Sequence, residues 1–177
     1  MKNKDLVLCS LFAALTGILA QISLPFPGGV SLTLQTFAVS LCAILLGSKK
    51  AFISLVVYIC IGVIGIPVFS DFKGGFQAIL GPTGGFILSF PVMAFIIGYI
   101  CEKTRNKMYM FLSIILGSFV NYMFGIIQFM LVTNLSFEEA LLSCFVPFIF
   151  TDLTKIILAT LLGYKLKYNK SIQNVIV

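Results

Sequence analysis

Long apolar runs separated by short polar stretches dominate this sequence. The runs extend approximately over residues 6–24, 32–46, 51–69, 84–101, 108–132 and 137–162. A helix needs about 20 mostly apolar residues to cross the hydrocarbon core of a bilayer. The second run is short for a full span, and we expect it to borrow residues from its flanks. The pattern therefore predicts an all-α integral membrane protein, with six transmembrane helices that form a single domain over residues 1–177.

The first run needs separate consideration, because it follows Lys2 and Lys4 as the core of a signal peptide would. Its apolar stretch is longer than the roughly 7–15 residues of such a core, so we expect a retained helix. Small residues within it would let another backbone approach closely. These small residues serve either packing within the chain or docking to a partner protein. They are Ser10, Ala13, Ala14 and Gly17.

Composition and charge agree with a membrane protein. Hydrophobic residues make up 59% of the chain and charged residues 10%, whereas soluble domains carry about a quarter charged residues. The net charge of +6 does not indicate nucleic acid, because the basic residues flank the apolar runs in short clusters. We expect a multi-pass protein of the cell membrane with cytoplasmic termini. The clusters are Lys2/Lys4, Lys49/Lys50, Lys103/Arg105/Lys107 and Lys165/Lys167/Lys170.

The loops on the opposite side are then residues 25–31, 70–83 and 133–136, which are rich in glycine, proline and polar residues. Lys73 is the exception to the charge asymmetry, because it lies in an outer loop. It either attracts an anionic ligand, offsets Asp71 or meets a lipid phosphate. We expect a ligand cavity near the outer half of the bundle.

The chain has no histidine, and its five cysteines lie in or beside apolar runs without CxxC spacing. Histidine is the commonest general base and metal ligand, so its absence disfavours both kinds of site. No Gly-Lys-Ser/Thr phosphate loop is present. We expect buried thiols, no metal or cofactor, and no nucleotide bound by this chain.

Asp152 and Lys155 carry the clearest chemical signal, since both lie inside the last apolar run. An ionisable group at mid-bilayer depth costs a few kcal/mol unless it is compensated. Their spacing of three puts them on one helical face, and we expect that face to point inward. The pair either stabilises the bundle alone or binds a urea, amide or lactam-like head group. Pro147 should kink the helix nearby.

A glycine-rich outer segment, residues 72–86, allows tight turns and close approach to a ligand. An ordinary turn between spans is an equally good interpretation. Thr83 could cap the following helix and direct its N–H groups toward a carboxylate. Polar residues inside other runs, among them Gln35, Asn121 and Gln128, are individually better explained as interhelical hydrogen bonds.

The chain contains the segments 28–37 (GGVSLTLQTF), 62–69 (GVIGIPVF), 74–75 (GG), 80–85 (LGPTGG) and Pro147 through Lys155. Taken together, these segments resemble the BioY family of biotin transporters. The resemblance spans nearly the whole chain. Ser31 is a minor departure, since proline or an isoleucine-type residue is expected there.

The resemblance implies a high-affinity biotin-binding S component of an energy-coupling factor (ECF) transporter. Such a subunit associates with a transmembrane coupling subunit and two ATPases, and Ser10, Ala13, Ala14 and Gly17 become its candidate docking face. Asp152 and Lys155 would bind the ureido ring of biotin, and Phe76 would join the aromatic walls. The remaining implied binding residues are Gln35, Tyr58, Phe69, Lys73, Gly74, Gly75, Gly81, Thr83, Gly84 and Asn121.

Other functions stay open at this point. The ligand could be another small carboxylate-bearing vitamin. A membrane enzyme or intramembrane protease would have to use a Thr/Lys pair such as Thr151 with Lys155, or an Asp/Lys site. A channel or structural subunit is disfavoured, because channels generally have polar rings or repeated pore-lining motifs.

Overall fold

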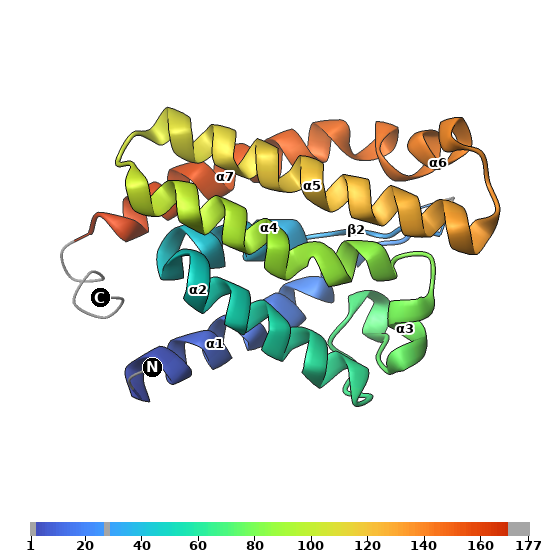
Figure 1. The fold of residues 1–177 in the computed structure, drawn as a ribbon, viewed down its shortest axis with the longest axis horizontal. Coiled ribbons are helices and arrows are strands. Elements are labelled where there is room, and N and C mark those ends of the chain that lie inside the picture. Colours follow the sequence, from blue (N-terminus) through green and yellow to red (C-terminus); the bar gives the residue numbers. More distant parts are fainter. Residues whose placement is uncertain (1–2, 27–28, 170–177) are drawn as a thin grey trace.

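The computed structural model describes residues 3–26 and 29–169, so Lys2, Gly28 and Lys170 lie outside the described residues. It is a helical bundle (Figure 1), with a small antiparallel hairpin of two-residue strands that the sequence pattern does not predict. Its elements are α1 (Asn3–Ala20), β1 (Ser23–Leu24), β2 (Leu32–Thr33), α2 (Gln35–Val63), η1 (Ser70–Phe72), α3 (Phe76–Leu80), α4 (Gly84–Lys103), α5 (Lys107–Thr133), α6 (Phe137–Cys144), η2 (Val146–Phe148) and α7 (Ile149–Lys167).

The second and third predicted runs are continuous in the structure as the single element α2. It is interrupted at Gly47, whose φ of 78° and ψ of −179° are not helical, and its two parts run in different directions (Figure 1). A side chain at Gly47 would meet Glu102, whose Oε1 accepts a hydrogen bond from the Ser48 N–H at 2.7 Å. The carboxylate therefore caps the second part of α2.

Among the described residues, five segments are long and apolar enough to cross a membrane, where the hydropathy pattern predicts six. They are α1, the bent α2, α4, α5 and the stretch Phe137–Lys167. The last of these contains α6, η2 and α7, and the α-helix is interrupted at η2, which contains Pro147, where the sequence predicts a kink. The protein is therefore mostly helical and has several candidate membrane spans.

The two ends of the bundle differ in charge. The start of α1, the bend at Gly47, the turn from α4 to α5 and the end of α7 all lie at one end, on the left of Figure 1. The hairpin, α3 and the turn from α5 to α6 lie at the other end. Within the described residues, the basic side chains other than Lys155 lie in or beside the first group of segments, with Lys73 as the exception.

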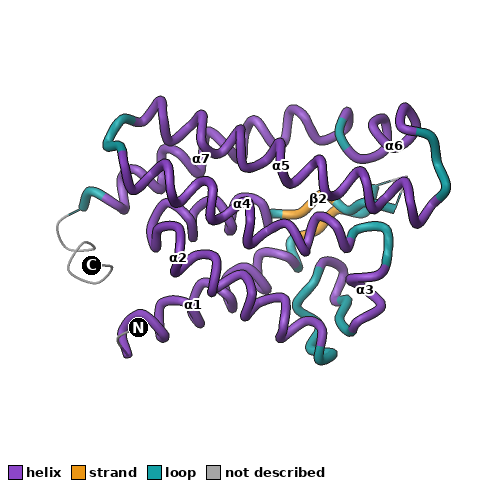
Figure 2. The backbone as a smooth tube through the Cα atoms, viewed as in Figure 1, coloured by secondary structure: helices purple, strands orange, loops and turns teal. Residues whose placement is uncertain are grey.

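Helix α2 packs between α1 and α4, and α4 packs on α5 (Figure 2). The junction with α1 is partly polar, because the Ser54 hydroxyl donates to the Cys9 carbonyl at 2.7 Å and Lys50 pairs with Asp5 at 2.6 Å. Close approach of α4 needs Gly98, where a Cβ would lie 2.5 Å from the Ser48 nitrogen. Fully buried apolar residues such as Met93 and Ile97 fill the interior.

Asp71 organises the end of the bundle that carries the hairpin and α3. Its two carboxylate oxygens accept hydrogen bonds from Ser23 of β1 at 2.6 Å and from Ser31 at 2.7 Å. The pKa of Asp71 is lowered most by the bond from Ser23 and next by the bond from Ser31. The positive charge of Lys73 lowers it further, whereas partial burial of the carboxylate raises it. Asp71 thus joins the hairpin to η1, beside the mouth of the bundle.

Candidate ligand-binding site

A cavity of about 70 Å³ lies where the hairpin, α2, α4, α5 and α7 meet. Its lining combines residues far apart in the sequence: β2 and the start of α2 contribute one wall, and α7 contributes the ion pair. Five of the residues predicted to bind ligand line it, namely Gln35, Thr83, Asn121, Asp152 and Lys155.

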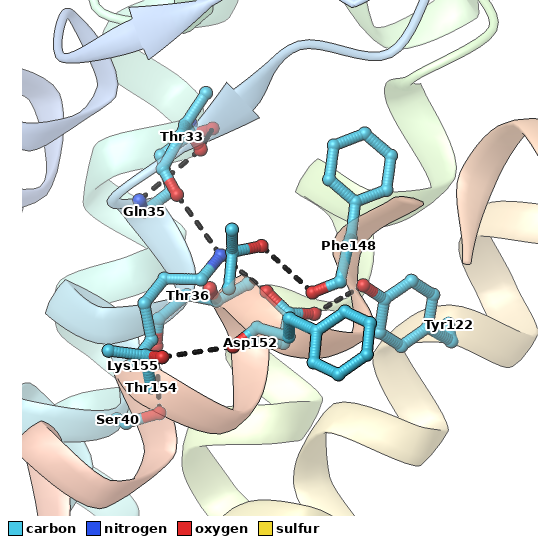
Figure 3. A network of polar contacts seen from close by, with 11 residues as sticks. Thr33, Gln35, Thr36, Ser40, Tyr122, Phe148, Asp152, Thr154 and Lys155 are labelled. Atoms are coloured by element: carbon cyan, nitrogen blue, oxygen red, sulfur yellow. Dashed lines mark hydrogen bonds and ion pairs between the residues drawn. The ribbon is translucent and has the colours of Figure 1, made fainter. Parts of the chain in front are cut away.

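Asp152 and Lys155 form an ion pair in the interior, as their spacing predicts. Lys155 Nζ lies 2.5 Å from Asp152 Oδ1, and the two side chains are only 15% and 11% exposed for Asp152 and Lys155 respectively. Lys155 also donates to the Thr33 carbonyl at 3.2 Å, and the Tyr122 hydroxyl donates to Asp152 Oδ2 (Figure 3). Each charge is therefore compensated by its partner and by one further hydrogen bond, as burial of charge requires.

Gln35 is held in place by a chain of hydrogen bonds. Its Oε1 accepts from the Thr33 hydroxyl at 2.9 Å, and its Nε2 lies 2.7 Å from the Tyr58 hydroxyl, to which it donates. That hydroxyl in turn donates to the Val68 carbonyl at 3.0 Å. Tyr58 therefore supports Gln35 from behind and is not itself part of the cavity lining.

Thr36 is a site residue that the sequence pattern does not indicate. Its hydroxyl is buried, and within the described part of the chain it is the one buried side-chain nitrogen or oxygen without a hydrogen-bond partner. Thr36 lines the cavity together with Lys155. A buried hydroxyl without a partner is costly, so a donor or acceptor on a bound ligand would satisfy it.

Four aromatic residues form another part of the walls, and they too are absent from the binding residues predicted from sequence. Phe86, Phe90 and Phe148 line the cavity with Tyr122. The Tyr122 ring makes edge contacts with Phe86 at 5.9 Å and with Phe145 at 5.1 Å between centroids. The arrangement suits a ligand with an apolar body.

Asn121 and Thr83 both line the cavity, and Asn121 also joins two helices. The Asn121 amide donates to the Phe86 carbonyl at 2.8 Å and to Ser89 Oγ at 2.7 Å, which joins α5 to α4 as the packing interpretation predicts. Thr83 occupies the N-cap position of α4, but its side chain makes no capping hydrogen bond. The expected cap at Thr83 is therefore absent, and the residue lines the cavity instead.

The other predicted binding residues do not line the cavity. The Phe69 ring packs on Gly62 and on Tyr58, and Phe76 is exposed. The Lys73 side chain is 60% exposed and lies 3.4 Å from Asp71. The glycines Gly74, Gly75, Gly81 and Gly84 serve backbone turns and close packing; at Gly84, for example, a Cβ would lie 1.7 Å from the Ile79 carbonyl.

The four small residues of α1 form one stripe along the helix, but only one edge of that stripe is buried. Ala13 and Gly17 are buried, and a Cβ on Gly17 would lie 3.3 Å from Val68, so this pair packs inside the chain. Ser10 and Ala14 are exposed on the outside of α1. The exposed pair lies along the outer edge of this stripe and remains a prediction for docking.

The site lacks the arrangement expected of a hydrolase. The Thr151 hydroxyl donates to the Phe148 carbonyl of its own helical segment at 2.8 Å, and Lys155 is engaged with Asp152 and Thr33. A nucleophile needs a free base within hydrogen-bond reach, and this pair offers none. Among residues 3–26 and 29–169 there is also no group of three His, Cys, Asp or Glu side chains that would hold a metal ion.

Known proteins match this chain over nearly its whole length. A model of the BioY family matches residues 1–171. A probable biotin transporter BioY from Pyrococcus horikoshii is 40% identical over 169 residues, which cover 96% of this chain and 99% of the relative. The biotin transporter BioY of Thermotoga maritima is 36% identical over 164 residues, covering 93% and 96%.

A solved structure shares the fold. It is the crystal structure, at 2.1 Å, of the S-component for biotin from an ECF-type ABC transporter, with a TM-score of 0.90 and 25% sequence identity. The match covers 100% of both chains. The helical bundle described above therefore has the fold of a known S-component for biotin.

Proposed function

Because this chain belongs to the BioY family, we propose that it takes up biotin as the high-affinity, substrate-binding S component of an ECF-type transporter. It is a transport subunit and not an enzyme. The observation that carries the proposal is the buried ion pair of Asp152 and Lys155 beside a cavity that contains one unpaired hydroxyl. A pair kept only for stability would not need that cavity.

The ureido ring of biotin fits the chemistry of these groups. A urea offers two N–H donors and one strong carbonyl acceptor. The Asp152 carboxylate retains lone pairs for a urea N–H, and Lys155 and Thr36 can both donate to the urea oxygen. Gln35, held by Tyr58, supplies a further donor or acceptor at the same wall. The side chains of Asp152, Lys155, Thr36 and Gln35 are the proposed head-group contacts.

The apolar part of biotin would lie against the aromatic walls. Phe86, Phe90 and Phe148 offer faces for the bicyclic ring and the aliphatic chain. Thr83, at the N-terminus of α4, is the proposed contact for the carboxylate, because the first N–H groups of a helix favour an anion. Lys73 is directed to Asp71, so we assign it to the outer loop and not to the ligand.

The chain is a multi-pass membrane protein, and we place it in the cell membrane with both termini in the cytoplasm. The support is the clustering of basic residues at the end of the bundle where α1 begins and α7 ends. The opposite end, with the hairpin and α3, then faces outward and admits biotin. The six-span topology follows if the two parts of α2 on either side of Gly47 each cross the bilayer.

We further propose that the subunit binds no nucleotide or other cofactor itself, and that a transmembrane coupling subunit and two ATPases supply the energy. The exposed pair Ser10 and Ala14 on α1 is the proposed docking surface for the coupling subunit, since small residues permit close helix packing in a bilayer. Co-purification of the tagged chain with coexpressed coupling proteins, and its loss on S10L or A14L, tests this assignment.

The ligand assignment is tested by calorimetric titration of the purified protein with biotin. Binding tighter than micromolar is expected, and binding that is weaker, or unchanged by D152A, would reject the proposal. Two analogues test the two ends of the ligand separately. 2-Iminobiotin has an imino group in place of the ureido oxygen, and biotin methyl ester lacks the negative charge of the carboxylate. Competition by another carboxylate-bearing vitamin as strong as that by biotin would favour the broader vitamin-transport alternative.

A further inference from the structure

A second hollow lies on the outside of the bundle, between α5 and the α6–α7 segment. It has a volume of about 330 Å³ and is lined mainly by apolar side chains. Several of them are exposed at the surface, among them Ile115, Phe119 and Leu153. In a membrane this groove therefore opens toward the lipid.

The groove and the ligand cavity share a wall. Tyr122 and Asp152 line both of them, whereas Phe119 lines only the groove. The Tyr122 hydroxyl donates to Asp152 Oδ2, and the Tyr122 ring stands between Phe86 and Phe145 at right angles to both. This hydrogen-bonded pair of side chains is therefore part of the wall between the polar cavity and the outside of the bundle.

The depth of the groove determines what it contacts. Its α5 residues, from Ile115 to Tyr122, lie around the middle of Lys107–Thr133, and Asp152 lies around the middle of the span Phe137–Lys167. The middle of a span is at the level of the hydrocarbon core, far from the lipid head groups. The Asp152 carboxylate at its floor already has partners on both oxygens, so the groove fits an acyl chain.

We propose that Tyr122 is the seal between the biotin cavity and a lipid acyl chain lying in this groove, and that its hydroxyl positions Asp152 for the ligand. The positioning part rests on the proposed function, whereas the sealing part does not depend on the identity of the ligand. Removing the hydroxyl frees the carboxylate to turn, and removing the ring connects the cavity to the bilayer.

The seal can be tested with a native thiol. Cys144 lines the cavity and is only 1% exposed. N-cyclohexylmaleimide, an uncharged reagent that partitions into lipid, is added to the protein in vesicles, and labelling of each cysteine is followed by peptide mass mapping. We expect Cys144 to be protected in the wild type and in Y122F, which keeps the ring, and to be labelled several-fold faster in Y122A.

Matched controls are present in the same chain. F119A enlarges the groove without touching the cavity, so Cys144 should remain protected. Cys60 is exposed and should be labelled equally in every variant, while the fully buried Cys42 should stay unlabelled. If Y122A exposes Cys42, its fold is lost and Y122L replaces it in the same comparison.

The outcomes decide the proposal. Equal protection of Cys144 in wild type and in the folded small-side-chain variant overturns it, and this is also the result expected if a second copy or a partner helix fills the groove. Labelling of Cys144 in F119A as fast as in Y122A overturns it as well.

In biotin titrations, Y122F should lose about tenfold or more in affinity, as expected for a hydrogen bond to a charged group, whereas F119A should lose none. An unchanged affinity in Y122F overturns the positioning role.

Failure of the proposed function gives a different pattern. A wild-type protein that does not bind biotin would refute the ligand assignment, but the labelling of Cys144 would still report on the seal. The two inferences are therefore separable within one set of variants.

Discussion

Lys155 Nζ donates a hydrogen bond to the Thr33 carbonyl, 122 positions earlier in the chain, at 3.2 Å. This contact joins α7 to the end of the β1–β2 hairpin. The same ammonium group pairs with Asp152, so one side chain connects the buried charge, the cavity and the segment at the cavity mouth.

The first prediction separates a structural role of the ion pair from a ligand-binding role. K155M leaves the Asp152 carboxylate buried without its counter-charge, so the unfolding free energy should fall by about 3–5 kcal/mol. The double variant D152N/K155M removes both charges and should recover most of that stability. Biotin binding should be lost in both variants. Thermal unfolding in detergent and calorimetry measure the two effects, and biotin binding by the double variant would show that the pair serves structure only.

The second prediction concerns the unpaired hydroxyl. T36V replaces the Thr36 hydroxyl by a methyl group of similar size, and biotin affinity should fall roughly five- to tenfold for one lost hydrogen bond. Stability should be unchanged or slightly higher, because a buried hydroxyl without a partner is removed. T16V is the matched control: Thr16 is fully buried, but its hydroxyl donates to the Phe12 carbonyl, away from the cavity. Equal losses of affinity in the two variants would contradict a ligand contact at Thr36.

The third prediction concerns acid pH. The hydrogen bonds from Ser23 and Ser31 lower the pKa of Asp71 below its ordinary value of 3.8. The folded-state pKa is thus below the unfolded one, so the stabilisation is complete above that ordinary value and is lost as the pH falls through the folded pKa. Hydrogen exchange of the hairpin, corrected for the intrinsic pH dependence, should therefore increase in strongly acidic buffer. In D71N this step should be absent, and a hairpin equally protected across the range would count against the assignment.

The fourth prediction concerns the bend in α2. G47A forces a side chain into a backbone conformation that is almost restricted to glycine, at a cost of about 1–3 kcal/mol, and brings its Cβ to 2.2 Å from Glu102 Oε1. Thermal stability should fall clearly. G65A is the comparison, because Gly65 has a φ of +105° and a Cβ added there would meet nothing within 4 Å. A smaller loss of thermal stability in G65A than in G47A would measure the contribution of the contact with Glu102. Equal losses of stability would show that only the backbone strain matters.

Much of the architecture could be predicted from hydropathy, because the thickness of a bilayer imposes a length on every span. The inward position of Asp152 and Lys155 could be predicted for a related reason: two charges in an apolar run need compensation. The join of the second and third runs at Gly47 could not be predicted from hydropathy, because it depends on one backbone conformation and on a carboxylate of another helix.

The candidate site was only partly predictable. Glycine-rich sequence indicates a turn but not which surface the turn faces, so it suggests Gly74 and Gly75 for a cavity that they do not line. Tyr58 and Phe69 are aromatic residues of the third apolar run, yet they pack behind the site. Thr36 has no distinguishing signal in the sequence, since a missing hydrogen-bond partner exists only in three dimensions.

The pairing of Asp152 with Lys155 has an electrical consequence. The pair carries no net charge, so any movement of it across the membrane field performs no net electrical work. Biotin adds a neutral ring and one carboxylate, and only that single charge would respond to the transmembrane voltage, by about 2.3 kcal/mol per 100 mV if it crossed the whole field. The voltage dependence of uptake would then belong to the cargo and not to its carrier.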